Sequence, residues 1–380
     1  MSPLIHILLY LVLFISLYIH SKNKYKLKNE SLFWIASIGV IILFTIIEGC
    51  RYGRGADYLS YKYRFENIDI FEPQKLYLAI NEFLHFLNAD FVGAFMTYSL
   101  IFIVGTFYFI RHTFDRGYTK WMYLFAILAM LYKFESFPKQ YLGLPFILCS
   151  IPYMFEKRKW WYAFIFILLG LNIHSGLTFL VLALISTFIL LKKTLPLKYW
   201  LIALIVVYYI LPPGFLSSIF TSALQMLNLD SFLLSDHITH YVENSDRWLG
   251  EDSVIESAQQ TFVTKTLQFL FNASVIISTL KALQIKYDPK IMCFFNITAI
   301  GFIFCRAFHG YEIFARLFGQ LDIFWFIPLC YSLYVYSHSS LQKKEKKLMK
   351  ACLICAIAYQ VMFYGRFIFL NPGAMYVWDL

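Results

Sequence analysis

Four short polar stretches stand out in this chain of 380 residues because they combine arginines, tyrosines and possible proton acceptors. The first, RYGRGADYLSY at 51–61, places two arginines and an aspartate directly after an apolar run. Guanidinium groups bind phosphate oxygens in bidentate pairs, and tyrosine rings with their hydroxyl groups suit sugars. These residue types together indicate a site for a ligand that carries both phosphate and sugar. The other stretches are KQ at 139–140, NIHSG at 172–176 and CRAFHGYEIFAR at 305–316.

The composition places these stretches in a membrane protein. Of all residues, 59% are hydrophobic and 15% are charged, whereas roughly 45–50% of residues are apolar in soluble domains. Long uncharged runs of helical length predict an all-α polytopic membrane protein and not a β-barrel. We expect about twelve spans with both ends of the chain outside, near 3–20, 31–49, 91–110, 121–137, 141–155, 160–174, 176–191, 199–213, 262–280, 291–308, 313–336 and 349–366.

The distribution of basic residues predicts the orientation of these spans. Six short connections carry 21 of the 33 Lys and Arg residues but only five acidic residues. By the positive-inside rule these connections face the cytoplasm, so the net charge of +10 reflects membrane orientation and indicates no nucleic-acid partner. The four polar stretches then share the outer face. The six connections are 21–30, 111–120, 156–159, 192–198, 281–290 and 341–350.

Two further segments are predicted on the outer side. Residues 64–90 include EPQKLYLAINEFLHFLNAD, whose apolar residues recur at helical spacing and predict an amphipathic helix at the outer interface. Residues 214–261 carry seven acidic residues against the single Arg247 and predict a long acidic loop. No internal repeat or linker divides the chain, so we predict a single integral membrane domain over 1–380 that contains this loop.

Basic residues on the outer face are the strongest functional signal. An arginine at a membrane interface is commonly an anchor that reaches towards the headgroups. Charges at membrane depth are costly unless they are paired or line a wet cavity, which makes them functional candidates. The outer cations occupy the face that the positive-inside rule disfavours, and their concentration is harder to explain as anchoring. They are Arg51, Arg54, Lys139, Arg306 and Arg316.

The order and spacing of these residues resemble a known family. RYGRGADYLSY is similar to the arginine, glycine, aspartate and tyrosine signature at the second span of EpsG-like exopolysaccharide polymerases, relatives of the Wzy-type O-antigen polymerases. The later motifs of that family resemble KQ at 139–140, HS at 174–175 and YEIFAR ending at Arg316. Lys139 departs from the arginine expected in the second motif, which keeps the charge but loses bidentate geometry. The resemblance covers residues from about 40 to 330.

This resemblance implies an activity and a location. It implies a metal-independent, GT-C-like glycosyltransferase that moves a growing glycan from undecaprenyl pyrophosphate to the non-reducing sugar of a fresh lipid-linked repeat unit. The donor and acceptor would both be undecaprenyl-pyrophosphate-linked glycans in the bacterial inner membrane, with the site on the periplasmic side. A flippase, a chain-length regulator and membrane lipid are the implied partners. We expect no cofactor and no metal, and interpret Asp236, His237 and His240 in SDHITH as loop decoration.

The leaving group defines the first set of candidate residues. Negative charge grows on the pyrophosphate when its bond to the anomeric carbon breaks, and fixed cations in a cavity of reduced dielectric stabilise such charge best. We therefore predict that Arg51, Arg54 and Arg316 bind the pyrophosphate and that Lys139 assists.

The attacking sugar hydroxyl defines the second set, because its proton needs an acceptor. His174 is the first candidate for this catalytic role and Asp57 is the second. The structural alternatives are a hydrogen-bonded histidine at a helix end, and a salt bridge from Asp57 to Arg51 or Arg54. The residues predicted to bind sugar or acceptor are Tyr58, Tyr61, Gln140, Arg306, His309 and Glu312.

Three other classes of membrane protein use related features. An O-antigen ligase would also bind a lipid pyrophosphate outside but would pass the glycan to lipid A core. A membrane O-acyltransferase that modifies a surface glycan would use a histidine such as His174, and it would leave the outward arginines unexplained. A transporter would place charges near the bilayer midplane, where Lys133, Glu135 and Asp322 are the nearest examples, but it would also favour repeated halves.

Overall fold

A computed structural model describes residues 3–24, 27–55, 57–67, 72, 74–115, 117–156, 159–190, 193–212, 261–308, 312–369 and 375–379 of the protein. The chain forms two compact units, each with its own buried apolar residues. The first unit is Met1–Leu182 with Gln360–Leu380, and the second unit is Ala183–Tyr359. The single integral membrane domain predicted from the sequence stays a prediction, and its predicted outer loop lies outside the described residues apart from Thr261.

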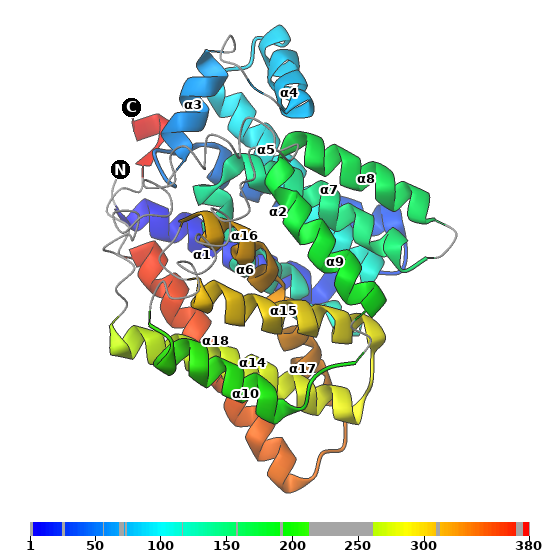
Figure 1. Ribbon diagram of the computed structural model, residues 1–380. Helices are drawn as coiled ribbons and strands as arrows, with labels where there is room; N and C mark the ends of the chain where they lie inside the picture. The colour runs from blue at the N-terminus through cyan, green and yellow to red at the C-terminus, as the bar shows by residue number, and fades with distance from the viewer. Residues whose placement is uncertain are drawn as a thin grey trace, which may run out of the picture. The chain divides into compact units, whose positions relative to one another are not determined.

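The first unit contains the helices that carry three of the four polar stretches (Figure 1). A short antiparallel sheet joins β1 (Arg51–Tyr52) to β2 (Met375–Tyr376), with Arg51 opposite Tyr376. The helices are α1 (Pro3–Lys24), α2 (Glu30–Gly49), α3 (Tyr58–Glu66), α4 (Lys75–Phe86), α5 (Phe91–Thr113), α6 (Met122–Ser136), α7 (Pro138–Met154), α8 (Trp160–Ile173), the start of α9 (Thr178–Leu190) and the end of α18 (Lys343–Phe369).

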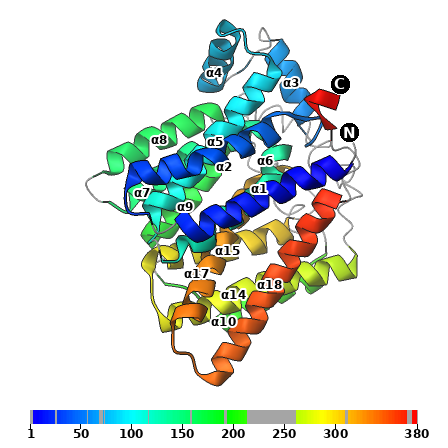
Figure 2. The same ribbon diagram turned by 180° about the vertical axis from the view of Figure 1, so that it is seen from behind.

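Four helices of the first unit pack one against the next, and α1 contacts two others. The helix α2 packs on α5, α5 on α7 and α7 on α8, while α1 lies along α2 and α6 (Figure 2). Side-chain caps fix where two of these helices begin. The Asn29 side chain accepts from the N–H of Leu32 ahead of α2, and the Asp90 side chain accepts from the N–H of Gly93 in α5.

Two glycines allow α7 and α8 to approach closely. A Cβ atom on Gly143 would lie 3.0 Å from the carbonyl oxygen of Gly170, and one on Gly170 would lie 3.1 Å from the carbonyl oxygen of Gly143. Small residues at such a contact let two helix backbones come together. The contact brings the start of α7, which carries Lys139, to the same end of the helix pair as His174, which follows α8.

The second unit is also helical (Figure 1). A π-helical turn at Val206–Ile210 extends α10, and a 3₁₀ turn at Ile323–Trp325 interrupts the predicted span 313–336 directly after Asp322. The helices are the end of α9, α10 (Leu197–Ile205), α14 (Phe262–Ile285), α15 (Pro289–Ala307), α16 (Glu312–Asp322), α17 (Phe326–His338) and the start of α18.

The helices confirm an all-α polytopic membrane protein. Each of the twelve predicted spans coincides with a helical segment, although the exact number of spans and the GT-C likeness stay predictions. Among the described residues, seven helices are long and apolar enough to cross a membrane, and three apolar helices are shorter, namely Trp160–Ile173, Ser175–Ile189 and Leu197–Ile210. The seven are Leu4–Asn23, Glu30–Gly49, Phe91–Thr113, Phe262–Ile285, Pro289–Ala307, Arg316–His338 and Lys343–Ile368.

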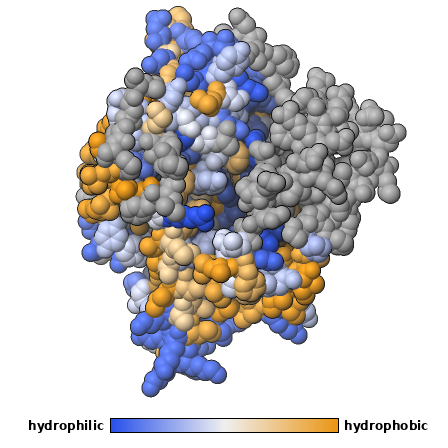
Figure 3. Space-filling view, turned by 90° about the vertical axis from the view of Figure 1, so that its left-hand side faces the viewer, coloured by the Kyte–Doolittle hydropathy of each residue, from blue (hydrophilic) through white to orange (hydrophobic). Residues whose placement is uncertain are grey.

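Apolar side chains reach the surface in broad patches (orange in Figure 3). Leu8 of α1, Ile42 of α2 and Val361 of α18 are among the exposed examples. This distribution is expected of helices whose outer faces contact lipid. The helix predicted within residues 64–90 is present as α4, which turns Tyr77, Asn81 and Leu84 inward from one face.

Candidate functional site

The loop after α2 is held against the end of α6 by two glycines. Gly53 has φ +69° and Gly55 has φ +99°, conformations that other residues rarely adopt. A Cβ atom on Gly55 would lie 1.8 Å from the carbonyl oxygen of Glu135. The N–H of Asp57 then donates to the carbonyl oxygen of Ser136 at 3.2 Å. The glycines of the first polar stretch therefore bring its arginines to the carboxylate at the end of α6.

We expect Gly55→Ala to disrupt this arrangement. The backbone strain alone costs about 1–3 kcal/mol, and the added methyl group would overlap the Glu135 carbonyl. The variant should unfold at a lower temperature in detergent and lose activity. Gly39→Ala is the matched control because a Cβ atom on this helical glycine meets nothing within 4 Å. An unchanged melting temperature for Gly55→Ala would contradict the described loop.

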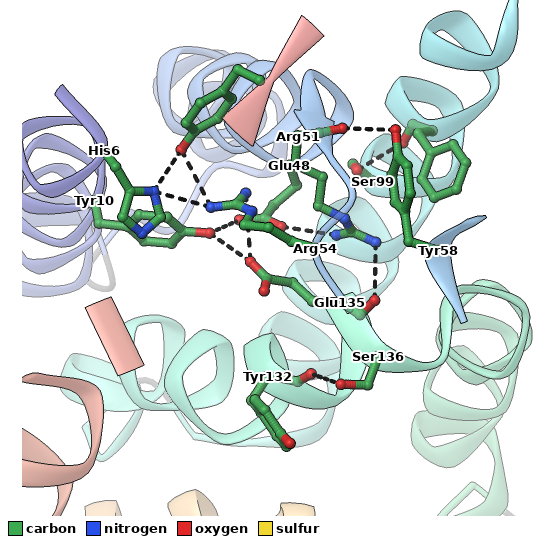
Figure 4. Close-up of polar contacts among 12 residues, drawn as sticks. His6, Tyr10, Glu48, Arg51, Arg54, Tyr58, Ser99, Tyr132, Glu135 and Ser136 are labelled. Atoms are coloured by element: carbon green, nitrogen blue, oxygen red, sulfur yellow. Dashed lines mark hydrogen bonds and ion pairs between the residues drawn. The ribbon is translucent and has the colours of Figure 1, made fainter. Parts of the chain in front are cut away.

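Arg51 is completely buried in an ion pair. Its Nη1 atom lies 2.9 Å from Oε2 of Glu48, and both side chains have 0% exposure. Its guanidinium carbon lies 4.9 Å from the centre of the Phe134 ring. The hydroxyl group of Tyr58 donates to the backbone oxygen of Arg51 at 2.9 Å (Figure 4). Arg51, the first residue predicted to bind the pyrophosphate, is thus fixed through both its side chain and its backbone.

Arg54 lies beside a second carboxylate. Its Nη2 atom is 3.6 Å from Oε1 of Glu135, with both side chains buried. The Nη1 atom donates to Nδ1 of His6 at 3.1 Å and lies 3.4 Å from the hydroxyl oxygen of Tyr376. Burial alone would lower the pKa of Arg54, but the nearby carboxylates, above all Glu135, hold that pKa well above its usual value. Arg54 is therefore a permanently charged group away from water.

One edge of the Arg54 guanidinium carries donors that make no hydrogen bond among the described residues. Within the described part of the chain, its Nε and Nη2 atoms have no hydrogen-bond partner, and the Nε atom of Arg51 has none either. Nε and Nη2 share the edge from which a guanidinium donates two parallel hydrogen bonds to a phosphate or carboxylate. Buried donors normally find acceptors. Because Oε1 of Glu135 lies 3.6 Å from Nη2, an anion that accepts from this edge would lie beside that carboxylate.

Tyr10 of α1 connects the two carboxylates. Its hydroxyl oxygen lies 2.6 Å from Oε1 of Glu48 and 2.7 Å from Oε1 of Glu135 (Figure 4). The buried charge cluster, meaning Glu48, Arg51, Arg54 and Glu135, is thereby joined across α2, α6 and the loop between α2 and α3. The two carboxylates balance the two guanidinium charges.

Sequence reasoning predicted the two arginines of this cluster but missed its two carboxylates. Glu48 carries a visible signal, because it is an acid at the end of an apolar span and three residues before Arg51. Glu135 was expected to be a midplane charge only if the protein were a transporter, whereas the structure pairs it with Arg54. His6 and Tyr376 contact Arg54 from distant parts of the sequence and give no local signal.

Asp57 and the predicted sugar-binding residues Tyr58 and Tyr61 lie at the start of α3, and of these Tyr58 contacts the cluster through Arg51. Asp57 precedes α3, and its side chain does not cap that helix. The carboxylates described above beside Arg51 and Arg54 are those of Glu48 and Glu135. The Tyr61 ring meets the Tyr77 ring edge-on at 6.2 Å. Tyr58 is fully buried.

Lys139 belongs to a second group of polar contacts. Its Nζ atom lies 2.5 Å from Oε1 of Glu72 and 2.5 Å from Oε1 of Gln74, and 4.6 Å from the centre of the Tyr77 ring. The Nε2 atom of Gln74 donates to Oγ of Ser175 at 3.5 Å. The segment before α4 thus joins the second and third polar stretches. The neighbouring Gln140 is buried.

His174 occupies the turn between α8 and a 3₁₀ helix at Ser175–Leu177. Its Nδ1 atom accepts from the backbone N–H of Gly176 at 3.4 Å, and the ring is partly buried. A neutral imidazole that accepts at Nδ1 carries its hydrogen on Nε2. In this arrangement His174 presents a hydrogen-bond donor at Nε2.

The fourth polar stretch lies in the second unit. The Arg306 guanidinium, in the last turn of α15, lies 5.2 Å from the centre of the Tyr208 ring, and Asn272 donates to the Tyr208 hydroxyl at 2.9 Å. Arg316 is partly buried in α16. His309 and the side chain of Glu312 lie outside the described residues. That these residues join the arginines of the first unit stays a prediction.

The described residues contain no group of three or more His, Cys, Asp or Glu side chains that could hold a metal ion. Asp236, His237 and His240 lie outside those residues.

The sequence profile of the EpsG family matches residues 34–378. This match covers nearly the whole chain and confirms the resemblance seen in the four polar stretches. Comparisons with curated proteins and with solved structures found no match.

Proposed function

Because the chain belongs to the EpsG family, we propose that it polymerises undecaprenyl-pyrophosphate-linked oligosaccharide repeat units into O-antigen or exopolysaccharide. The family supports a polysaccharide polymerase in the membrane, and the apolar helices support a multi-pass protein. The observation that carries the proposed substrate is the buried Arg54, whose Nε and Nη2 donors make no hydrogen bond within the described residues. The reaction is placed at the periplasmic side of the bacterial inner membrane.

The proposed step exchanges one bond for another. A hydroxyl oxygen on the non-reducing sugar of the acceptor attacks the anomeric carbon of the donor glycan. The bond from that carbon to the pyrophosphate oxygen breaks, and undecaprenyl pyrophosphate leaves with the electron pair. The hydroxyl proton passes to a basic group of the protein. The acceptor keeps its own lipid pyrophosphate and becomes longer by the transferred glycan.

The arginines of the buried charge cluster would stabilise the negative charge of the leaving pyrophosphate. Arg54 would donate from its Nε and Nη2 edge to pyrophosphate oxygens, and Arg51 would add positive charge beside it. Glu48 and Glu135 hold the two guanidinium groups in place before substrate binds. Such preorganised charge needs little rearrangement as the leaving group becomes more negative. Lys139, which contacts Glu72 and Gln74, would assist in binding the pyrophosphate.

The remaining predicted residues keep their proposed roles. Arg316 would contact the pyrophosphate from α16. His174 and Asp57 are the candidates for accepting the proton. His174 would accept it at Nδ1, in place of its hydrogen bond from the Gly176 N–H, because Nε2 already carries a hydrogen. Since the Tyr58 hydroxyl donates to the backbone of Arg51, this tyrosine can also hold the arginine in place. The proposed sugar or acceptor contacts are Tyr58, Tyr61, Gln140, Arg306, His309 and Glu312.

Purified protein supplied with a lipid-pyrophosphate repeat unit as its sole substrate tests this function. With EDTA present, we expect a ladder of glycans that differ by one repeat unit, since the proposed step uses no metal. Transfer to lipid A core without a ladder would indicate the O-antigen ligase, and acyl transfer would indicate the acyltransferase. Either result would contradict the proposed polymerase. A flippase and a chain-length regulator are proposed partners in the cell and are not needed for this ladder.

A further inference from the structure

Two side chains from distant elements meet on one nitrogen of Arg54. His6 comes from α1 and Tyr376 from β2, and both are buried. His6 precedes the residues that match the EpsG family profile. The Nη1 atom of Arg54 lies 3.1 Å from Nδ1 of His6 and 3.4 Å from the Tyr376 hydroxyl oxygen, which itself lies 3.1 Å from the same Nδ1 atom.

The direction of these hydrogen bonds follows from the donors. A guanidinium has N–H donors and no acceptor, so Nδ1 of His6 must accept from Arg54 and carries no hydrogen. The Tyr376 hydroxyl then donates to the same Nδ1 atom or accepts from Nη1 of Arg54. Burial raises the pKa of Tyr376 to about 12, so its hydroxyl keeps its hydrogen at neutral pH. Arg54 is thus held at Nη1 by two neutral partners.

Backbone contacts fix the position of Tyr376. Its backbone is opposite Arg51 in the small sheet, and the N–H of Val377 donates to the carbonyl oxygen of Cys50 at 2.9 Å. The guanidinium carbon of Arg54 lies 4.9 Å from the centre of the Tyr376 ring. The tyrosine therefore meets Arg54 with its ring and with its hydroxyl group.

We propose that His6 and Tyr376 are positioning residues that hold Arg54 by Nη1 and so present its Nε and Nη2 edge to the lipid pyrophosphate. The difference in hydrogen bonding between the two sides of the guanidinium group supports this role. Nη1 donates to acceptors inside the protein, whereas Nε and Nη2 make no hydrogen bond among the residues described, and the carboxylate beside Nη2 is 3.6 Å away. An arginine whose orientation is fixed loses less entropy for each hydrogen bond formed to a phosphate.

The inference rests on the proposed function and is tested by binding. The probe is labelled undecaprenyl pyrophosphate in detergent, with undecaprenol as the uncharged control. Because hydrogen bonds to charged groups are strong, we expect Tyr376→Phe and His6→Leu each to weaken binding about tenfold. His6→Asn should retain most of the affinity, since its amide oxygen can accept from Nη1. Tyr364→Phe, a change at another buried tyrosine of the first unit, should have no effect.

A double-mutant cycle separates positioning from general damage. If Tyr376 acts through Arg54, then adding Tyr376→Phe to Arg54→Gln should change the affinity less than about twofold. Additive losses, or unchanged binding by Tyr376→Phe, would overturn the positioning role while leaving Arg54 as a ligand. Unchanged binding by Arg54→Gln alone would overturn both this inference and the proposed pyrophosphate site.

Discussion

Arg51→Ala is expected to abolish polymerisation and to lower the free energy of unfolding by about 3–5 kcal/mol. The substitution leaves Glu48 as a buried carboxylate without its guanidinium partner, since both side chains have 0% exposure. It also removes positive charge from the proposed pyrophosphate site. Thermal unfolding in detergent and the glycan ladder measure the two effects on the same preparation.

A second variant separates the structural role of Arg51 from its catalytic role. In Glu48→Gln with Arg51→Gln, no unpaired charge remains, and the two amides can hydrogen-bond to each other. Because the cost of breaking a buried pair comes mainly from the orphaned charge, most of the lost stability should return. Polymerisation should stay absent. An active double variant would show that Arg51 serves only to balance Glu48.

Arg54→Lys is expected to reduce the polymerisation rate by about 10²–10³-fold while the protein stays folded. Lysine keeps a positive charge near Glu135 but lacks the edge that donates two parallel hydrogen bonds. Initial rates at saturating lipid-linked repeat unit measure this loss.

The matched control for that substitution is Arg64→Lys. Arg64 is in the same unit and lies 3.8 Å from Glu72, but its side chain is 47% exposed. Exposed ion pairs contribute little, so the control should keep its rate. Full activity of Arg54→Lys would show that a point charge is enough for the reaction. It would contradict the proposed bidentate contact from Nε and Nη2 to the pyrophosphate.

The apolar spans are predictable because their signal is local. The uncharged run at 31–49 becomes α2 at Glu30–Gly49, and the run at 91–110 becomes α5 at Phe91–Thr113. In each case a polar residue ahead of the run caps the helix. The break after Asp322 was not predicted, because the residues of the 3₁₀ turn are as apolar as a helical span.

The burial of the arginines was not predictable from charge placement. The basic residues on the outer face suggested a cationic pocket with Asp57 as the acid beside them, but Arg51 and Arg54 lie inside the first unit beside Glu48 and Glu135. Their contacts span 84 residues between Arg51 and Glu135, and 322 residues between Arg54 and Tyr376. Local spacing cannot reveal partners at such separations.

The contacts of Lys139 were not predictable from local spacing either. The sequence suggested a pyrophosphate contact, and residues 64–90 were predicted as a separate interfacial helix. In the structure Lys139 and this segment are in contact, because Glu72 and Gln74 ahead of α4 contact the Lys139 ammonium group. Burying an unpaired ammonium group would be costly, and Glu72 and Gln74 supply the partners for the buried Lys139.

The central claim is that a lipid pyrophosphate leaves as each glycan bond forms. The measurement that tests it most directly counts the undecaprenyl pyrophosphate released by purified protein against the glycosidic bonds made from a lipid-linked repeat unit. We predict one molecule released for each bond, and a loss of both products together in Arg54→Lys. Glycan growth without release of undecaprenyl pyrophosphate, or release without growth in the wild type, would contradict the claim.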